Sequence, residues 1–356
     1  MRSFEKYLAV WVALCMLAGV LLSQTVPGLS QAINSWQIRG ISIPIGICLF
    51  LMMYPALLNL QLSEVRKLRD NPKPILLSLF ANWVMAPLLA LFLARLFLRG
   101  NEQLIVAMIL LGSSPCTAMV LVWGRLAEGN QEQNVINTSI NTLTIMFLYV
   151  PVVSLLTGIQ GIPIDRWTLL LSAFVFIGIP MLLGIVSKRF IIARKGPDWF
   201  LRVYRSRVEK VATLALLTTL VVLFSLNGQV LLQHFDKLLL VSVPLLTHFV
   251  IVVTYNLWVT RAFGLSYREA ITTVIISSSS HFEIAIATAV AMYGVGSMAA
   301  LGTTMGLFWE VPIMLSLVAL GKLLRDRGFW KPAPATTPGQ PVGERVPVEV
   351  EADDER

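Results

Sequence analysis

Long apolar stretches, separated by short polar segments, occupy most of the 356 residues. A helix needs about 20 mainly apolar residues to cross the hydrocarbon core of a membrane. The pattern therefore predicts an all-α integral membrane fold with ten transmembrane helices. The predicted spans are residues 7–22, 41–60, 74–98, 104–123, 135–156, 167–187, 211–226, 238–262, 270–293 and 298–320.

The composition supports this prediction. Hydrophobic residues make up 56% of the chain and charged residues only 13%, which is about half the charged fraction of a soluble domain. A water-soluble enzyme and a disordered chain are thereby excluded. The net charge of +8 would indicate a nucleic-acid partner only if the basic residues formed a surface patch. They are spaced between apolar runs instead, so we expect a lipid bilayer as the environment and no nucleic acid.

The distribution of basic residues predicts the orientation. With the N-terminus inside the cell, 23 of the 28 Lys and Arg residues fall on the cytoplasmic side. Because positively charged loops stay in the cytoplasm, we expect a multi-pass protein of the plasma or inner membrane with both termini in the cytoplasm. The densest basic segment, residues 188–210, is expected to anchor this topology beside anionic lipid.

The chain divides into a long apolar part and a short polar end. Residues 1–330 are predicted to form a single transmembrane domain. The segment 331–356 contains five prolines and six acids but few large apolar side chains. Such a segment cannot bury enough surface to fold, so we expect a disordered, acidic, Pro-rich cytoplasmic tail.

Ten spans suggest two sets of five, and an odd number of helices in each set makes the two repeats inverted, a common plan for transporters. Repeat one covers about residues 5–160 and repeat two about residues 161–325. The fourth and ninth spans occupy equivalent places, and each is interrupted by a polar run. These runs are Gly112-Ser113-Ser114-Pro115 and the four serines 277–280, whose centres lie 165 residues apart.

Both interruptions predict broken helices. Pro115 removes a backbone donor, and consecutive serines compete for backbone hydrogen bonds and favour unwinding. Unwound backbone survives in a membrane only where it is buried in protein or lines a cavity. We therefore expect a transporter domain with a binding cavity near the midplane, although two packed, kinked helices without a ligand would give the same pattern.

Two acids fall well inside the predicted spans, Glu283 and Glu310. A charged carboxylate in a membrane is costly, so each is a candidate for proton coupling. Burial disfavours the charged form of Glu283, whereas the start of a half-helix and a protonated His281 favour it. We therefore expect Glu283 to take up and release protons. Glu310 is either a second proton carrier or a protonated group that ties the last span to its neighbour.

The cysteines suggest one soft ligand. Cys116 follows Pro115 at the start of a half-helix, where oriented N–H groups favour the thiolate. Cys15 and Cys48 are expected to be inert core residues. The three lie far apart with no metal-ligand spacing, so neither a disulfide framework nor a cofactor is predicted.

Further polar residues cluster around the interruptions and are predicted to contact the substrate. They are Ser114 and Thr117 beside Cys116, and Ser280 and His281 in the ninth span. The fifth span carries a stripe at helical spacing, formed by Asn134, Asn137, Asn141 and Thr144. The stripe either lines the cavity, with Asn141 as a substrate contact, or joins helices by hydrogen bonds.

These motifs resemble those of a known family. The run Gly112-Ser113-Ser114-Pro115-Cys116-Thr117-Ala118-Met119-Val120-Leu121-Val122-Trp123 resembles the span-four signature of the Acr-type arsenite efflux permeases, which belong to the bile acid/arsenite/riboflavin transporter superfamily. Residues 281–287 resemble the span-nine signature of that family, and residues 310–314 its span-ten signature. The resemblance covers about residues 5–325.

The resemblance implies ten helices in two inverted five-helix repeats, with helices four and nine crossing at their breaks. It also implies export of arsenite, and often of antimonite, in exchange for protons, and hence arsenic resistance. The essential cysteine of the family falls on Cys116, which would bind As(III), and its span-nine glutamate on Glu283. Where the family commonly has Asn before the His/Asn-Phe-Glu segment, this sequence has Ser280, which leaves the substrate preference open.

Two other functions are compatible with parts of the pattern. A sodium-coupled symporter of an organic anion could bind Na⁺ through oxygens at the breaks and a carboxylate at half-helix N-termini, but it has no need of a thiol at Cys116. An intramembrane hydrolase built on Ser280 and His281 is disfavoured because adjacent helical residues do not face each other. We therefore expect a transporter and not an enzyme; the sequence does not indicate the oligomeric state.

Overall fold

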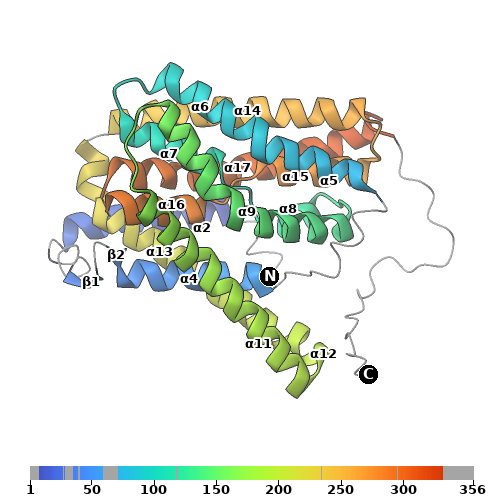
Figure 1. Ribbon diagram of the computed structural model, residues 1–356, viewed down its shortest axis with the longest axis horizontal. Helices are drawn as coiled ribbons and strands as arrows, with labels where there is room; N and C mark the ends of the chain where they lie inside the picture. Colours follow the sequence, from blue (N-terminus) through green and yellow to red (C-terminus); the bar gives the residue numbers. More distant parts are fainter. Residues whose placement is uncertain are drawn as a thin grey trace.

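The computed structural model describes residues 8–26, 28, 35–38, 41–58, 71–117, 119–233, 235–294 and 296–331. Apart from Lys331, the predicted tail 331–356 lies outside these residues. Two short strands of two residues each, β1 (Gln37–Ile38) and β2 (Ile41–Ser42), pair antiparallel. The other described elements are helical (Figure 1).

The helices follow the predicted spans in order. The first half contains α2 (Leu8–Thr25), α4 (Ile43–Leu58), α5 (Pro72–Phe80), the π-helical segment η2 (Ala81–Met85), α6 (Ala86–Phe97), α7 (Glu102–Gly112), α8 (Val120–Leu126) and α9 (Gln131–Ile159). The second half contains α10 (Arg166–Ala173), η3 (Phe174–Gly178), α11 (Ile179–Lys195), α12 (Pro197–Trp199), η4 (Phe200–Tyr204), α13 (Arg205–Gln233), α14 (Phe235–Ala262), α15 (Tyr267–Ser278), α16 (Phe282–Tyr293) and α17 (Met298–Asp326).

Six helices among the described residues are long and apolar enough to cross a membrane. They run over Pro72–Phe97, Gln131–Ile159, Arg166–Lys195, Pro197–Leu226, Asp236–Ala262 and Met298–Asp326. The halves α7 and α16 are apolar but too short to span alone. The all-helical membrane architecture is thus confirmed, whereas the count of ten spans and the inverted repeat stay predictions.

The outer surface is apolar, as expected for contact with lipid. On the helix formed by α5, η2 and α6, large apolar side chains recur every four residues and are 41–61% exposed, namely Leu76, Phe80, Val84, Leu88, Phe92 and Leu96. A soluble monomer rarely exposes an apolar stripe of this size.

Two long helices contain a π-helical turn that a proline explains. Pro87 and Pro180 each lie shortly after such a segment, η2 and η3 respectively. Proline has no N–H to continue the hydrogen-bond ladder, so the helix widens locally and continues. Both helices therefore bend without breaking, unlike the two spans described below.

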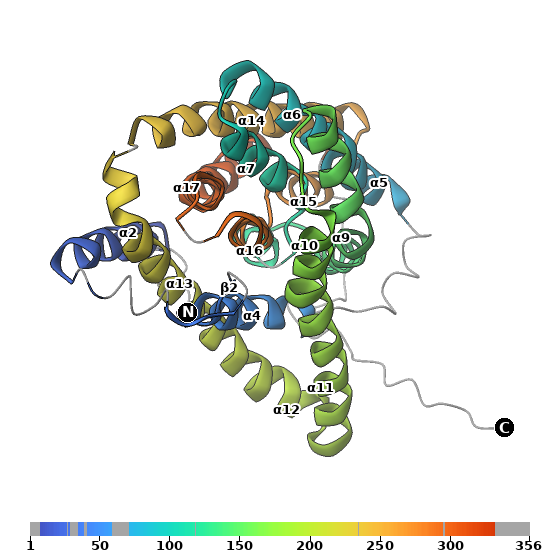
Figure 2. The same cartoon turned by 60° about the vertical axis from the view of Figure 1, so that its left-hand side comes forward.

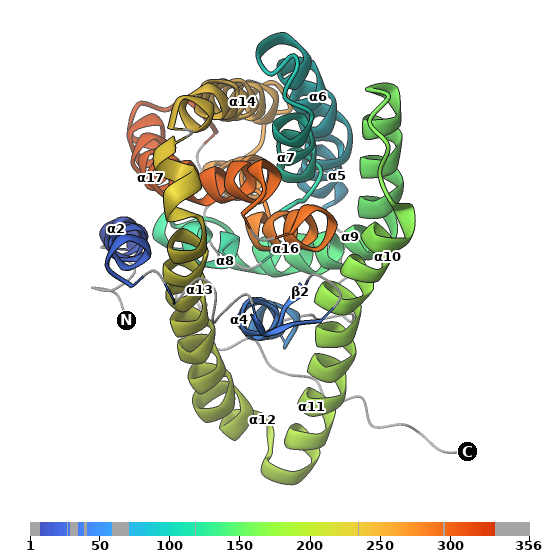
Figure 3. The same cartoon turned by 90° about the vertical axis from the view of Figure 1, so that its left-hand side faces the viewer.

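The helices pack as two groups. In the first, α13 packs along α2 and α4, and α4 also contacts α11. In the second, α6, α7, α14, α15, α16 and α17 pack on one another, with α5 and α9 alongside. Figures 2 and 3 show the second group gathered around α16, while α11, α12 and α13 extend to one side. The broken helices therefore lie inside the second group.

The segment after α8 is tied to α17. Glu128 accepts a hydrogen bond from Arg325 at 2.7 Å, and Nζ of Lys322 lies 3.3 Å from its carboxylate. The hydrogen bond from Arg325, followed by that from Lys322, lowers the pKa of the Glu128 carboxyl. The side chain of Trp330 beyond α17 donates to the hydroxyl of Thr260 on α14 at 3.1 Å. These contacts hold the ends of α8, α14 and α17 at one face.

Candidate functional site

The first break separates α7 from α8. The helix ends at Gly112, and the chain runs without helical structure through Pro115 and Cys116. At Gly112 the backbone of α7 lies close to α6, because a Cβ there would stand 2.4 Å from Cβ of Ala90. The predicted break is confirmed, and the glycine that precedes it is required by packing.

The second break separates α15 from α16. A capping box formed by Ser266 and Glu269 starts α15, and the helix ends at Ser278. Ser279 is extended, with φ −104° and ψ 137°, and α16 begins after His281. The serine run thus breaks the helix as predicted, without help from a proline.

The two breaks bind each other through their backbones. Pro115 and Ser280 form an isolated antiparallel bridge. The N–H of Cys116 donates to the carbonyl of Ser279 at 3.2 Å, and the N–H of His281 donates to the carbonyl of Ser114 at 2.6 Å. The groups that unwinding releases in one span are therefore satisfied by the other, which is the condition for irregular backbone in a membrane.

Glu310 on α17 holds the second break in place. Its carboxylate accepts hydrogen bonds from the Ser279 hydroxyl at 2.5 Å, from the Ser280 hydroxyl at 2.7 Å and from the Ser280 N–H at 3.3 Å. The side chain is buried, with 1% of its surface exposed. The expected tie between the last span and its neighbour is present, and its partners are the serines of the break.

Glu283 forms a buried pair with His281. Nδ1 of His281 lies 2.8 Å from a carboxylate oxygen of Glu283, in the first turn of α16. Among the described residues, Glu283 and Glu310 are the acids with buried side chains. The Ser280 hydroxyl bonds Glu310, whereas His281 bonds Glu283. The hydrogen bonds at this site therefore do not join Ser280 and His281 as a nucleophile and its base.

Cys116 is held by its backbone on both sides. While its N–H bonds Ser279, its carbonyl accepts a hydrogen bond from the side-chain amide of Asn141 on α9 at 3.2 Å. Oδ1 of Asn141 in turn accepts from the amide of Asn82 in η2 at 3.3 Å. Cys116 and Thr117 are both buried, and the three cysteines are not joined by disulfides. A thiol is thus fixed where two broken helices and α9 meet.

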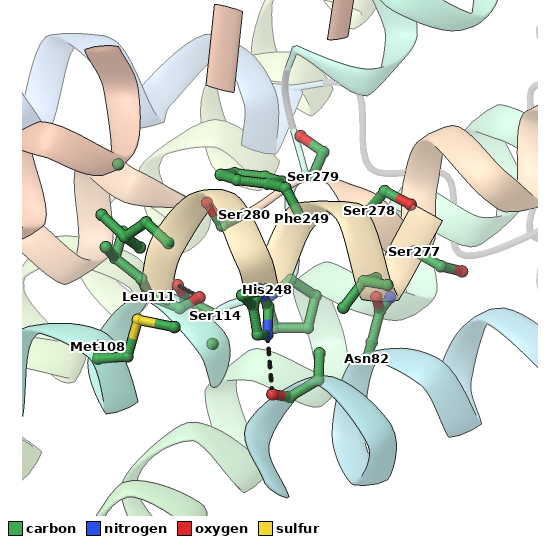
Figure 4. Close-up of a pocket in the computed structure, with 16 residues that line it drawn as sticks. Asn82, Met108, Leu111, Ser114, His248, Phe249, Ser277, Ser278, Ser279 and Ser280 are labelled. Atoms are coloured by element: carbon green, nitrogen blue, oxygen red, sulfur yellow. Dashed lines mark hydrogen bonds between the residues drawn. The ribbon is translucent and has the colours of Figure 1, made fainter. Parts of the chain in front are cut away.

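A narrow cavity lies beside the crossing (Figure 4). It is a small cavity of about 30 Å³, which corresponds to roughly two water molecules. Ser114, Pro115 and the serines 277–280 line it. Of the predicted substrate contacts, Ser114 and Ser280 lie on this cavity, whereas Cys116, Thr117, His281 and Asn141 are not among its lining residues.

Two cavity residues were missed by the sequence interpretation. His248 on α14 lines the cavity and bonds the carbonyl of Ala86 on α6 through Nε2 at 3.0 Å. Asn82 lines it as well. It is the one amide side chain in the apolar span 74–98, which is the signal that could have identified it.

The asparagine stripe of α9 makes interhelical contacts. Asn134 donates to the carbonyl of Val120, Asn137 to the hydroxyl of Ser78, and Asn141 to the carbonyl of Cys116. Thr144 accepts from the indole of Trp83. The hydrogen-bonding interpretation of the stripe therefore describes all four side chains, and one of them reaches the thiol-bearing segment.

Comparisons with known proteins give one consistent result. The sequence profile of the Sodium Bile acid symporter family matches residues 46–234. The chain is 38% identical over 350 residues to an uncharacterized transporter of Synechocystis sp., which covers 92% of this chain and 90% of the relative. It is 33% identical to the arsenical-resistance protein Acr3 of Alkaliphilus metalliredigens (90% of this chain, 93% of the relative) and 29% identical to the Acr3 of Corynebacterium glutamicum (88% and 87%).

Proposed function

Because the chain belongs to the Sodium Bile acid symporter family, we propose that it exports trivalent arsenic, as arsenite, in exchange for protons. The family is one of membrane transporters, and the apolar helices are those of a multi-pass membrane protein. We further propose ten transmembrane helices in two inverted repeats with both termini in the cytoplasm. The similarity to two arsenical-resistance proteins over about nine-tenths of the chain supports the cargo.

The observation that carries the proposal is the position of Cys116. Trivalent arsenic is a soft centre that prefers thiolate ligands. The backbone of Cys116 is bonded to Ser279 and Asn141, so its buried thiol lies at the crossing, whereas the expected core residues Cys15 and Cys48 are only half-buried, within α2 and α4. A single thiol among oxygen ligands binds arsenic reversibly, whereas three thiolates would hold it too tightly for release. Ser114, Thr117, Ser280, His281 and Asn141 are the proposed oxygen and nitrogen contacts.

Proton coupling is assigned to the two buried acids. Arsenous acid is mostly neutral at neutral pH, so the membrane potential alone cannot expel it and a coupled ion is required. Glu283 pairs with His281 at the start of α16, and Glu310 holds Ser279 and Ser280. A change of protonation at either acid alters the hydrogen bonds of the second break, which is bonded to the backbone of Cys116. Binding of a proton and of arsenic are thereby linked.

A sodium-coupled symporter of an organic anion is the second candidate, because the family profile is that of bile acid symporters. Serine hydroxyls and carbonyls around the crossing could bind Na⁺. The cavity beside the crossing is lined by Ser114 and the serines 277–280, which suits a small polar cargo better than a steroid. The thiol at the crossing also has no role in that chemistry, so we favour arsenite.

Everted membrane vesicles that contain the full-length protein test the proposal. Arsenite should accumulate when a pH gradient, acidic inside the vesicles, is imposed, and a proton uncoupler should abolish accumulation. Vesicles without the protein are the control. Accumulation that follows a sodium gradient and ignores the pH gradient would support the symporter instead.

A further inference from the structure

Three helices begin at the same face and run side by side toward the crossing. They are α5, α9 and α15, and each contacts the other two. Polar side chains recur on the side of each helix that faces its neighbours, about one turn apart except between Asn71, the residue before α5, and Ser78, which lie two turns apart. The three stripes are Asn71, Ser78 and Asn82 on α5 and η2, Gln133, Asn137 and Asn141 on α9, and Glu269, Thr273 and Ser277 on α15.

The stripes bind one another along their length. Near the face, the amide of Gln133 donates to the Thr273 hydroxyl at 2.9 Å and to the Glu269 carbonyl at 3.2 Å. One turn deeper, the amide of Asn137 donates to the Ser78 hydroxyl at 3.1 Å. Still deeper, the amides of Asn82 and Asn141 meet. We name this arrangement of nine residues the polar row.

Several oxygens of the polar row lack a protein partner. Oε1 of Gln133, Oδ1 of Asn137 and Oγ of Ser277 are buried and have no hydrogen-bond partner within the described part of the chain. Leaving a buried polar atom unpaired costs about 1–3 kcal/mol. In Gln133 and Asn137 the N–H groups are paired with protein atoms and the oxygens remain unpaired. Water is the natural partner for such oxygens.

The outer end of the polar row meets solvent. Asn71 is exposed and donates to Oε1 of Glu269 at 2.6 Å. Glu269 is partly exposed and is fixed there by the capping box with Ser266. This pair closes the row at the face where the three helices begin, so the carboxylate of Glu269 lies between the row and solvent.

The inner end of the polar row reaches the crossing. Asn82 and Ser277 line the cavity beside the paired breaks (Figure 4), and Asn141 bonds the carbonyl of Cys116. Beyond the end of α15, Ser279 and Ser280 bond Glu310. Separate hydrogen-bonded pairs of hydroxyl and amide groups therefore follow one another from Glu269 at the face to Asn82 and Asn141 at the crossing, and bridging water is needed to connect one pair with the next.

We propose that the polar row is a hydrated path along which the coupling proton passes between the crossing and the cytoplasmic face. Each water in the path accepts one proton and releases another, so one positive charge moves and no bond to the protein is formed. The assignment of the proton rests on the proposed function. The hydration of the path rests on the geometry alone.

Cysteine accessibility tests the hydration directly. The full chain is prepared with Cys15, Cys48 and Cys116 replaced by Ser, and a single cysteine is introduced as Asn137→Cys or, on α15, as Thr273→Cys. Everted vesicles are treated with a charged, membrane-impermeant methanethiosulfonate, and loss of the free thiol is followed. Both cysteines should be modified from this side. Thr273→Cys nearly conserves the side-chain volume, so it serves if Asn137→Cys does not fold.

Ile140→Cys is the matched control, because Ile140 lies on the same helix one turn away but packs in a small apolar cluster with Ile75 and Ile136. It should stay unmodified. Asp326→Cys reports the surface, since Asp326 is exposed beside Arg325 at the same face.

The proposal is overturned if Asp326→Cys is modified while Asn137→Cys and Thr273→Cys both stay protected. It is also overturned if Asn137→Cys and Thr273→Cys are modified only in right-side-out vesicles. The labelled chain lacks Cys116, so the result does not depend on arsenite transport. If vesicles of the unaltered protein fail to accumulate arsenite while residue 137 is labelled, the proposed function fails and the hydrated path stands.

Discussion

The N–H of Cys116 donates a hydrogen bond to the carbonyl of Ser279, 163 positions later in the chain, at 3.2 Å. This bond joins the unwound segments of two broken helices and places the thiol of one beside the serine run of the other. Any movement of the second break must therefore move or release the segment that carries Cys116. The predictions below test the groups that hold this arrangement together.

Glu310 is expected to combine a structural and a coupling role. Glu310→Ala removes the acceptor of the buried Ser279 hydroxyl and of the half-buried Ser280 hydroxyl; an unpaired buried hydroxyl costs about 1–3 kcal/mol, so the thermal midpoint of the detergent-solubilised protein should fall. Glu310→Gln keeps an acceptor oxygen and should retain most of the thermal stability, but it should lose accumulation driven by the pH gradient. Normal accumulation of arsenite by Glu310→Gln under the pH gradient would show that this side chain only holds the serines in place and does not carry the proton.

Glu283 is expected to carry the proton without binding the cargo. Glu283→Gln keeps a partner for His281 but cannot ionise. Arsenite should still protect Cys116 from alkylation in this variant, while accumulation driven by the pH gradient is lost. Glu128→Gln is the matched control, because Glu128 lies in an exposed loop, and this variant should transport normally. Loss of arsenite protection in Glu283→Gln would instead place Glu283 in the cargo site.

Gly112 is expected to be required for packing at the first break. In Gly112→Ala the new Cβ would stand 2.4 Å from Cβ of Ala90, and overpacking of this kind costs about 1–3 kcal/mol. The thermal midpoint should fall and should recover in the double variant Gly112→Ala, Ala90→Gly. Gly158→Ala on α9 is the control, since a Cβ there meets nothing within 4 Å. An unchanged midpoint for Gly112→Ala would contradict the close contact of α6 and α7.

The contacts of Glu128 with Arg325 and Lys322 make the stability of the fold depend on pH in a defined direction. The hydrogen bonds from Arg325 and Lys322 lower the pKa of Glu128 in the folded protein, so the fold gains stability above the ordinary Glu pKa and loses that gain as the pH falls through the lowered pKa. Exposed pairs contribute about 0–1 kcal/mol. The difference in thermal midpoint between the unaltered protein and Glu128→Gln should therefore be small at neutral pH and vanish in acid. A difference that grows in acid would contradict the pairing.

Local features of the fold could be predicted from the sequence. The missing N–H of Pro115 and the hydroxyls of the serine run act on their own backbone, so both breaks were recognisable without tertiary information. The burial of Glu283 and Glu310 followed from the apolar sequence around them. The helical spacing of Asn134, Asn137 and Asn141 predicted a shared face.

The partners of these groups could not be predicted, because they are distant in the sequence. Nothing near Glu310 indicates that it binds Ser279 and Ser280, and His248 reaches the cavity only because α14 packs against α6. The stripe on α9 fitted two interpretations until Asn137 was seen to bond Ser78. Long-range packing decides such contacts, and neither the spacing nor the type of a residue encodes it.

The most direct test of the central claim is the accumulation of arsenite in everted vesicles by the single variants Cys116→Ser and Cys48→Ser under the same pH gradient. Both substitutions replace a thiol by a hydroxyl, but only the first does so at the crossing. The account predicts that Cys116→Ser abolishes accumulation while Cys48→Ser retains it. Accumulation by Cys116→Ser at the level of the unaltered protein would contradict the account, because the thiol would then have no part in transport.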